Sequence, residues 1–162
     1  MSVTDELLKN NETYAERYEG AGGSPQPRKK VAILACMDAR ILPSKALGLH
    51  EGDAHIIRNA GGVVTDDAIR SLAISQHMLG TEEIILIQHT DCGLLKANDE
   101  EILGKLEEHA GERPPFHSHA FDDLEKNVRD SVEQLKGSPF LLNAAVRGFV
   151  FDVETGALTE VA

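Results

Sequence analysis

Short apolar runs along the chain predict buried strands. Residues 31–35 and 84–87 are continuously apolar, a pattern typical of strands that a parallel sheet buries on both faces. Residues 54–58 form a weaker candidate for a further strand. Near the C-terminus, residues 146–153 and 157–161 are separated by Glu-Thr-Gly, which predicts a terminal hairpin.

Between these runs, apolar residues recur at helical spacing. A short helix over 43–49 and a longer one over 66–79 separate the first three strand candidates, and residues 99–109 and 121–135 predict two amphipathic helices before the hairpin. Strands that alternate with helices indicate crossover connections and a parallel sheet. We therefore expect an α/β fold with helices on the faces of the sheet.

A further helix is predicted at the N-terminus, over residues 4–18. Thr4 is the expected N-cap, and Asp5 and Glu6 lie in the first turn, where acidic residues favour a helix start. Residues 20–27 are rich in Gly, Ser and Pro, which is typical of a turn or an extended linker. The helix is therefore expected to lie away from the core and to pack on a partner subunit.

Length and charge restrict the class of protein. A chain of 162 residues is expected to form a single domain over 1–162, with an N-terminal helix and linker in 1–23 and an α/β core in 28–162. The 16 Lys and Arg against 27 Asp and Glu give a net charge of −11. This argues against a nucleic-acid partner, because such binding needs basic side chains that neutralise phosphates.

The sequence also indicates the compartment. No apolar stretch approaches the roughly 18 residues that cross a bilayer, and the N-terminus lacks the pattern of a secretion signal. Two cysteines are too few for the disulfide framework of a small secreted domain. We therefore expect no membrane partner and a cytoplasmic protein.

Candidate metal ligands follow two of the predicted strands. Cys36 comes after the first apolar run, and His89 and Cys92 come after the run over 84–87. The carboxyl ends of parallel strands meet at one edge of a sheet, where ligands bind. Two thiols, an imidazole and an open fourth position match a catalytic zinc site. The alternatives are that the cysteines are small buried apolar residues or a redox pair, although the chain has no Cys-x-x-Cys motif.

Asp38 and Arg40 lie close to Cys36 in the sequence. The Asp38 carboxylate could accept a hydrogen bond from a zinc-bound water, and Arg40 could pair with it through two hydrogen bonds and keep it ionised. A purely structural salt bridge is the alternative for these two residues.

Three motifs, in this order and at this separation, resemble those of the β-class carbonic anhydrases, in particular the short, minimal bacterial and archaeal branch. They are Cys-Met-Asp-Ala-Arg at 36–40, Arg-Asn-Ala-Gly-Gly at 58–62 and His-Thr-Asp-Cys-Gly at 89–93. The similarity runs from about residue 31 to residue 161. It implies a mainly parallel four-stranded sheet with an added C-terminal strand. It also implies an obligate homodimer, wrapped by the N-terminal helices, that could pair into a dimer of dimers.

The resemblance also implies a site and a reaction. Cys36, His89 and Cys92 would bind one Zn²⁺ per chain, and Asp38 and Arg40 would form the catalytic dyad. The implied reaction is the reversible hydration of carbon dioxide to bicarbonate and a proton by zinc-bound hydroxide.

A glycine pair could support this site. Gly61 and Gly62 would let backbone N–H groups approach the carboxylate or the substrate, and a plain turn is the alternative. The chain has no Trp, and its two tyrosines, Tyr14 and Tyr18, lie in the predicted N-terminal helix. It therefore lacks the aromatic pocket residues of some larger, plant-like members of the family.

Two other functions stay open. The same zinc site would serve a hydrolase of carbonyl sulfide or carbon disulfide, which short members of the family include. Alternatively, the zinc would only stabilise a non-catalytic dimeric binding protein.

Overall fold

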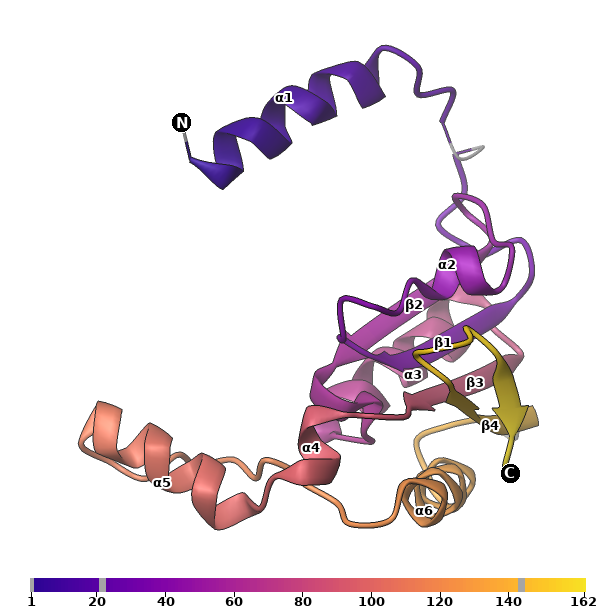
Figure 1. The fold of residues 1–162 in the computed structure, drawn as a ribbon. Helices are drawn as coiled ribbons and strands as arrows, with labels where there is room; N and C mark the ends of the chain where they lie inside the picture. The colour runs from indigo at the N-terminus through magenta and orange to yellow at the C-terminus, as the bar shows by residue number, and fades with distance from the viewer. Residues whose placement is uncertain (1, 21–22, 143–144) are drawn as a thin grey trace.

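The structure, a computed structural model, describes residues 2–20, 23–142 and 145–162. In these residues, five strands form one sheet in the order β2-β1-β3-β4-β5 (Figure 1). The strands are β1 (Val31–Cys36), β2 (Ala54–Asn59), β3 (Glu83–His89), β4 (Ala145–Phe151) and β5 (Leu158–Glu160). Strands β1 to β4 pair in parallel, and β5 is antiparallel to β4. The predicted α/β fold and its added C-terminal strand are confirmed.

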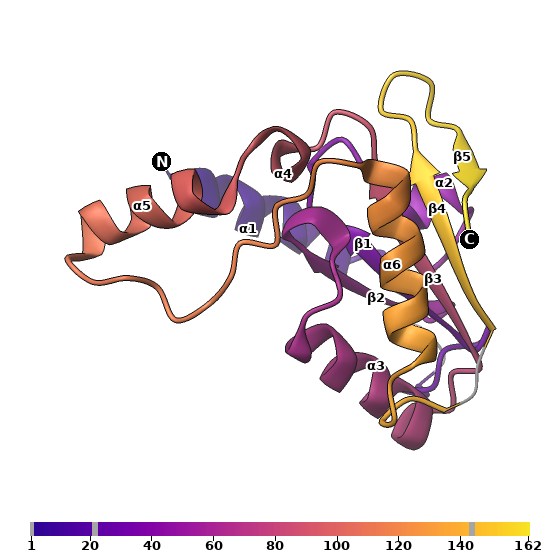
Figure 2. The ribbon, with the colours of Figure 1, turned by 90° about the horizontal axis from the view of Figure 1, so that it is seen from below.

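Side chains of β1 alternate between two apolar layers, and every residue of this central strand is buried. On one face, Ala32 and Leu34 pack in a cluster with residues of α3 (Asp66–Leu79) and α6 (Leu124–Lys136). Figure 2 shows both helices on that side of the sheet. On the other face, Ile33 and Ala35 pack with residues that follow β1 and β3 and with the end of β4. The apolar run therefore predicted a strand buried on both faces, as found.

Two strands extend beyond the apolar runs that predict them. Cys36 is the last residue of β1 and pairs with Asn59, and His89 is the last residue of β3 and pairs with Phe151. Both residues were expected just after their strands. Because ladder hydrogen bonds hold their backbones, the two side chains have fixed positions at the carboxyl edge of the sheet.

The remaining helices differ from prediction mainly at their ends. The helix over 66–79 is found as predicted, whereas the one expected over 43–49 is shorter. Two short helices were not predicted: η1 (Ala60–Gly62), in the 58–62 motif, and α4 (Gly93–Lys96), directly after Cys92. The other two helices of this group are α2 (Pro43–Ala46) and α5 (Asp99–Ala110).

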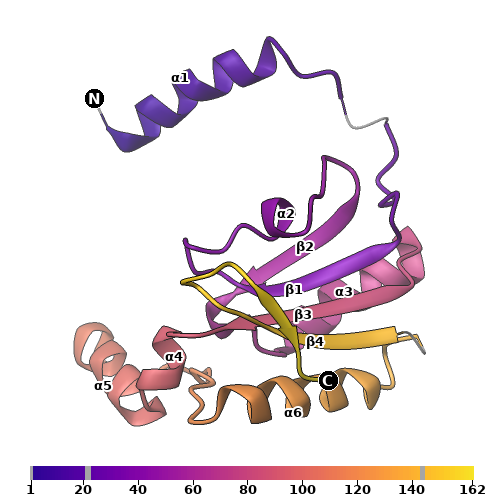
Figure 3. The ribbon, with the colours of Figure 1, turned by 45° about the vertical axis from the view of Figure 1, so that its right-hand side comes forward.

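The N-terminal helix, α1, spans Val3–Ala15. Its N-cap is Ser2 and not Thr4: the Ser2 side chain accepts a hydrogen bond from the Asp5 N–H, and the Asp5 carboxylate accepts one from the Ser2 N–H. No residue of α1 is buried, and Figures 1 and 3 show the helix apart from the sheet.

The predicted linker includes residues 21 and 22, which lie outside the described residues. Within the described ranges, no helix is both long and apolar enough to cross a membrane.

Candidate metal centre

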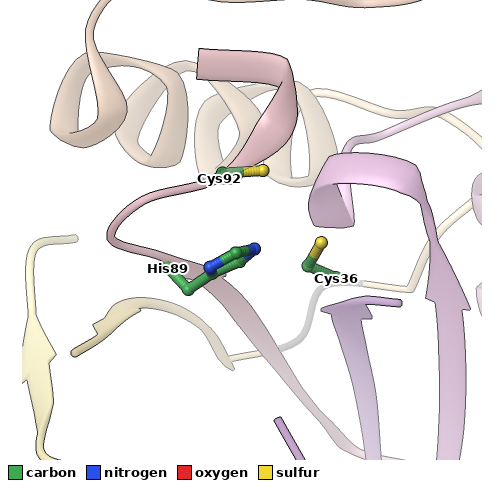
Figure 4. Close-up of side chains that lie close together, drawn as sticks. All are labelled: Cys36, His89 and Cys92. Carbon is green, nitrogen blue, oxygen red and sulfur yellow. The ribbon is translucent and has the colours of Figure 1, made fainter. Parts of the chain in front are cut away.

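Cys36, His89 and Cys92 meet at the carboxyl edge of the sheet. Cys36 ends β1, His89 ends the neighbouring β3, and Cys92 is the N-cap of α4. All three are buried, and one donor atom from each lies within 4.8 Å of the others. Figure 4 shows the imidazole and the two sulfur atoms around one space. The chain topology therefore brings the end of β1 to the end of β3 and the start of α4, which lie far along the chain from it.

The hydrogen bonding of His89 fits a metal ligand. Its Nδ1 lies 2.8 Å from the carbonyl oxygen of Thr90, which can only accept, so Nδ1 carries the proton. The lone pair is then on Nε2, which is buried and has no hydrogen-bond partner among the described residues. Metal-binding histidines show this arrangement, in which one ring nitrogen donates to the protein and the other is left for the metal.

The surroundings of the two sulfur atoms also favour a cation. Contact with the Cys92 thiol lowers the pKa of Cys36 to about 4, and the same contact raises the pKa of Cys92. The backbone of Asp38 and Gly61 also lowers the pKa of Cys36, and the backbone in the first turn of α4 opposes the rise in the pKa of Cys92. A divalent cation between them would favour the thiolate form of both. Two thiolates and one neutral imidazole are a donor set that suits zinc.

A carboxylate and a guanidinium lie beside this cluster. Arg40 donates through Nε to Asp38 Oδ1 at 3.0 Å and through Nη2 to Asp38 Oδ2 at 2.8 Å. The Arg40 backbone N–H also donates to Oδ1, at 2.8 Å. These side-chain and backbone hydrogen bonds hold the pKa of Asp38 well below its usual range. Asp38 Oδ2, which accepts a single hydrogen bond from Arg40, lies 3.8 Å from His89 Nε2.

Two glycines allow the 58–62 turn to contact Cys36. Gly61 and Gly62 have φ angles of 82° and 60°, in the left-handed region. A Cβ on Gly62 would lie 2.7 Å from the Cys36 nitrogen and 2.8 Å from the Ile87 oxygen. Only a residue without a side chain fits this close approach of the turn to the backbone of Cys36.

Sequence analysis did not single out two residues that contact this site. Arg58 donates to the carbonyl oxygen of Cys36 at 2.8 Å and to that of Asp38 at 2.8 Å. Asp91 accepts from Arg40 Nη1 at 2.9 Å and also pairs with Lys96. The hydrogen bonds from Lys96 and Arg40 lower the pKa of Asp91 to about 2. Both Arg58 and Asp91 lie within the motifs at 58–62 and 89–93, and this position was the only sign in the sequence that they belong to the site. Nothing in the motifs indicates which residues they contact.

Comparisons with known proteins agree with this geometry. The sequence model of the carbonic anhydrase family matches residues 31–158. Beta-carbonic anhydrase 1 of Mycobacterium tuberculosis is 49% identical and covers 99% of both chains. The crystal structure of a carbonic anhydrase from Streptococcus mutans superposes with a TM-score of 0.93 at 41% identity, covering 100% of this chain and 99% of the other. A carbon disulfide hydrolase of Saccharolobus solfataricus is 36% identical, over 95% of this chain and 86% of its own.

Proposed function

The chain belongs to the β-class carbonic anhydrase family, and on this premise we propose that it catalyses the reversible hydration of carbon dioxide to bicarbonate and a proton, with one zinc ion per chain. One observation carries the proposal. The buried His89 Nε2, which has no hydrogen-bond partner among the described residues, lies beside two sulfur atoms and 3.8 Å from an ionised carboxylate.

Cys36, His89 and Cys92 are the proposed zinc ligands. Zinc at such a site would supply the Lewis acidity that makes water a better nucleophile. With three protein ligands, one coordination position stays open, as catalytic rather than structural zinc sites require. Strand pairing at the ends of β1 and β3 and the packing of Gly62 on the Cys36 backbone would hold Cys36 and His89 in place.

Asp38 and Arg40 are the proposed catalytic dyad. Asp38 is ionised at neutral pH, and Arg40 lowers its pKa still further, so its carboxylate accepts hydrogen bonds and does not donate them. Oδ1 already accepts two hydrogen bonds from Arg40, whereas Oδ2 accepts one and faces His89. Oδ2 therefore has a free lone pair towards the site, where it can accept a proton in a hydrogen bond and orient the water that attacks the substrate. Gly61 and Gly62 support the site by their close packing on Cys36.

The surroundings suit a small, uncharged substrate. The two sulfur ligands pack in an apolar cluster with Ile41, Ile87 and Phe151. Carbon dioxide matches this chemistry, and so do carbonyl sulfide and carbon disulfide. Hydrolysis of these sulfur compounds is the second candidate function, because a protein named as a carbon disulfide hydrolase aligns with 95% of the chain.

We also propose a homodimer, alone or paired into a dimer of dimers. Leu7 and Leu8 in α1 are 60% and 61% exposed, and large apolar side chains on a helix usually pack on another surface. A second copy would cover them. We also propose that each chain is a single domain over 1–162, with the N-terminal helix and linker in 1–23 and the α/β core in 28–162. The free thiols of Cys36 and Cys92 support a cytoplasmic location, where thiols stay reduced.

A comparison of substrates tests the proposed function. Zinc-loaded wild type should hydrate carbon dioxide much faster than it hydrolyses carbonyl sulfide or carbon disulfide, and Asp38→Asn should reduce hydration while it retains zinc. Faster turnover of a sulfur substrate would favour the second candidate. Zinc-loaded protein inactive on all three would overturn both and leave a zinc-stabilised binding protein.

A further inference from the structure

We propose that Asp91 is a positioning residue that fixes the Arg40 guanidinium, and through it the direction of the Asp38 carboxylate. This inference rests on the proposed function, because it assigns a part in that reaction to a residue outside the dyad. Asp91 lies between His89 and Cys92 in sequence, yet its side chain contacts Arg40 and Lys96.

The hydrogen bonds of Arg40 divide between two carboxylates. Nε and Nη2 donate to the two oxygens of Asp38, at 3.0 Å and 2.8 Å. Nη1 donates to Asp91 Oδ2 at 2.9 Å, and Nη2 also donates to the Asp91 carbonyl oxygen at 3.2 Å. Contacts on both sides of the planar guanidinium fix its rotation as well as its position.

Packing alone does not hold Arg40 in place. Its side chain is 46% exposed and borders an open hollow of about 500 Å³. An exposed ion pair between one arginine and one carboxylate contributes little by itself, because both side chains stay mobile. The second carboxylate is therefore the contact that would hold Arg40 in one orientation at this exposed position.

The backbone of Asp91 has an uncommon conformation that accompanies this contact. Its φ of 56° is in the left-handed region, which costs free energy in a residue other than glycine and is tolerated best by Asn and Asp. The neighbouring Thr90 ties the loop to the end of β4, because its N–H donates to the Phe151 oxygen at 3.0 Å and its side chain accepts from the Val153 N–H at 3.1 Å. Such strain persists where surrounding contacts enforce it, often at functional sites.

Lys96 balances the charge of Asp91. It pairs with Oδ1, while Arg40 pairs with Oδ2, so each oxygen of Asp91 faces one cation. Because Lys96 offsets the negative charge of Asp91, the charge of Arg40 stays available to Asp38. An amide at position 91 has a single oxygen and cannot face both cations with an acceptor.

The test is the variant Asp91→Asn, which keeps the size of the side chain and tolerates the left-handed backbone. In the zinc-loaded protein, kcat/KM for carbon dioxide hydration should fall about tenfold, the effect of losing a supporting contact around a metal site. Zinc content should not change. Asp67→Asn is the matched control, since Asp67 pairs with Arg70 at 2.9 Å on the surface of α3, and it should have wild-type activity.

A double-mutant comparison separates positioning from a general structural role. In an Arg40→Ala background, Asp91→Asn should change kcat/KM less than about twofold, because its effect passes through Arg40. An equal loss of kcat/KM in both backgrounds, or loss of zinc in Asp91→Asn, would overturn the proposal. Asp91 would then act on the segment between the candidate ligands His89 and Cys92 and not through Arg40.

A readout independent of activity is the hydrogen exchange of the Arg40 Nε–H by NMR in the zinc-loaded protein. It should be protected in the wild type and in Asp67→Asn and should lose protection in Asp91→Asn. Unchanged protection in Asp91→Asn would refute the positioning role. If the wild type did not hydrate carbon dioxide, the proposed function would fail, and this measurement would still decide whether Asp91 orders Arg40.

Discussion

At the scale of single residues, the proposed metal centre depends on groups with little freedom to move. His89 is fully buried, and its Nδ1 is committed to the Thr90 carbonyl oxygen. Cys36 is held by the strand ladder and by the turn that packs on its backbone. A metal site this rigid would select its metal through donor type and geometry and would need little rearrangement on binding.

The first prediction concerns zinc binding. Purified wild type should carry about one zinc per chain, and Cys36→Ser or His89→Ala should remove it, because a two-donor site binds far more weakly than a three-donor site. His109→Ala, at an exposed position of α5, is the control and should retain zinc. Elemental analysis of dialysed protein measures this, and full zinc in both ligand variants would contradict the assignment.

The second prediction concerns Gly62. Gly62→Ala should destabilise the fold by about 3 kcal/mol, from about 1 kcal/mol for a left-handed alanine and about 2 kcal/mol for the collision of its Cβ with the backbone of Cys36 and Ile87. Gly80→Ala separates the two effects. Gly80 is also left-handed, with φ 73°, but a Cβ there meets nothing within 4 Å, so about 1 kcal/mol is expected. Denaturant unfolding compares the variants, and equal losses would show that the close approach at Gly62 is unimportant.

The candidate ligands could be located in the sequence because they lie at or just beyond the ends of buried strands, and the parallel topology fixes where strand ends meet. The partners of these residues could not be found in the same way. The contact between Arg40 and Asp91 joins residues 51 positions apart and needs a left-handed backbone at Asp91. Sequence patterns carry neither kind of information.

At the scale of elements, the close packing of α6 on the sheet depends on another glycine. A Cβ on Gly148 in β4 would lie 2.6 Å from Val128 Cγ1 and 2.8 Å from Val132 Cγ2. Both valines are fully buried. The missing side chain therefore lets the helix approach the strand.

The third prediction follows from this contact. Gly148→Ala should lower the free energy of unfolding by about 1–3 kcal/mol, because the added methyl overpacks the interface with α6. The control is Gly104→Ala in α5, where a Cβ meets nothing within 4 Å. That change should raise stability by up to about 1 kcal/mol, since alanine favours a helix. If Gly148→Ala left the free energy of unfolding unchanged or raised it, α6 could move away from β4 at little cost, and the close packing would not matter for stability.

Strand and helix identities could be predicted because the apolar runs and helical spacings are strong, and α3 was predicted to the residue. The ends of the helices and strands were harder to predict. Ser2 competes with Thr4 for the N-cap of α1, and the reciprocal hydrogen bonds with Asp5 favour Ser2. The short α4 has no apolar periodicity to reveal it, because four residues make a single turn.

At the scale of the whole molecule, α1 is joined to the core but covers none of it. Its described contacts with the core include the hydrogen bond from Tyr14 to Glu51, and its apolar side chains are exposed. An isolated helix of 13 residues is marginally stable in water. In our proposal, the helix would gain this stability by packing on the second subunit.

The fourth prediction tests that assignment. Deleting residues 1–23 should weaken the dimer or make the protein insoluble, and Leu7→Ser/Leu8→Ser should weaken it with the chain intact, because both remove the apolar face. The control Asn10→Ser changes an exposed polar residue of the same helix and should have no effect. Sedimentation velocity over a range of concentrations measures the association, and a truncated dimer of unchanged stability would contradict the proposal.

The pH dependence of the reaction concerns the site as a whole. Two thiolates cancel the formal charge of Zn²⁺, so water at this site should have a pKa above the value of about 7 found with three histidines. Asp38 does not contribute to a change in this range. Its pKa is lowered, so it stays ionised from neutral pH upwards and loses its charge only in acid.

The most direct test of the account is therefore stopped-flow hydration of carbon dioxide by the zinc-loaded protein across pH, with metal-stripped protein as the control. We expect kcat/KM to be low near neutrality and to rise through about pH 8, and we expect the stripped protein to be inactive until zinc is restored. A flat kcat/KM between about pH 6 and 9 would contradict a rate limited by a zinc–thiolate site. Absence of hydration by the zinc-loaded protein at every pH would contradict the proposed function itself.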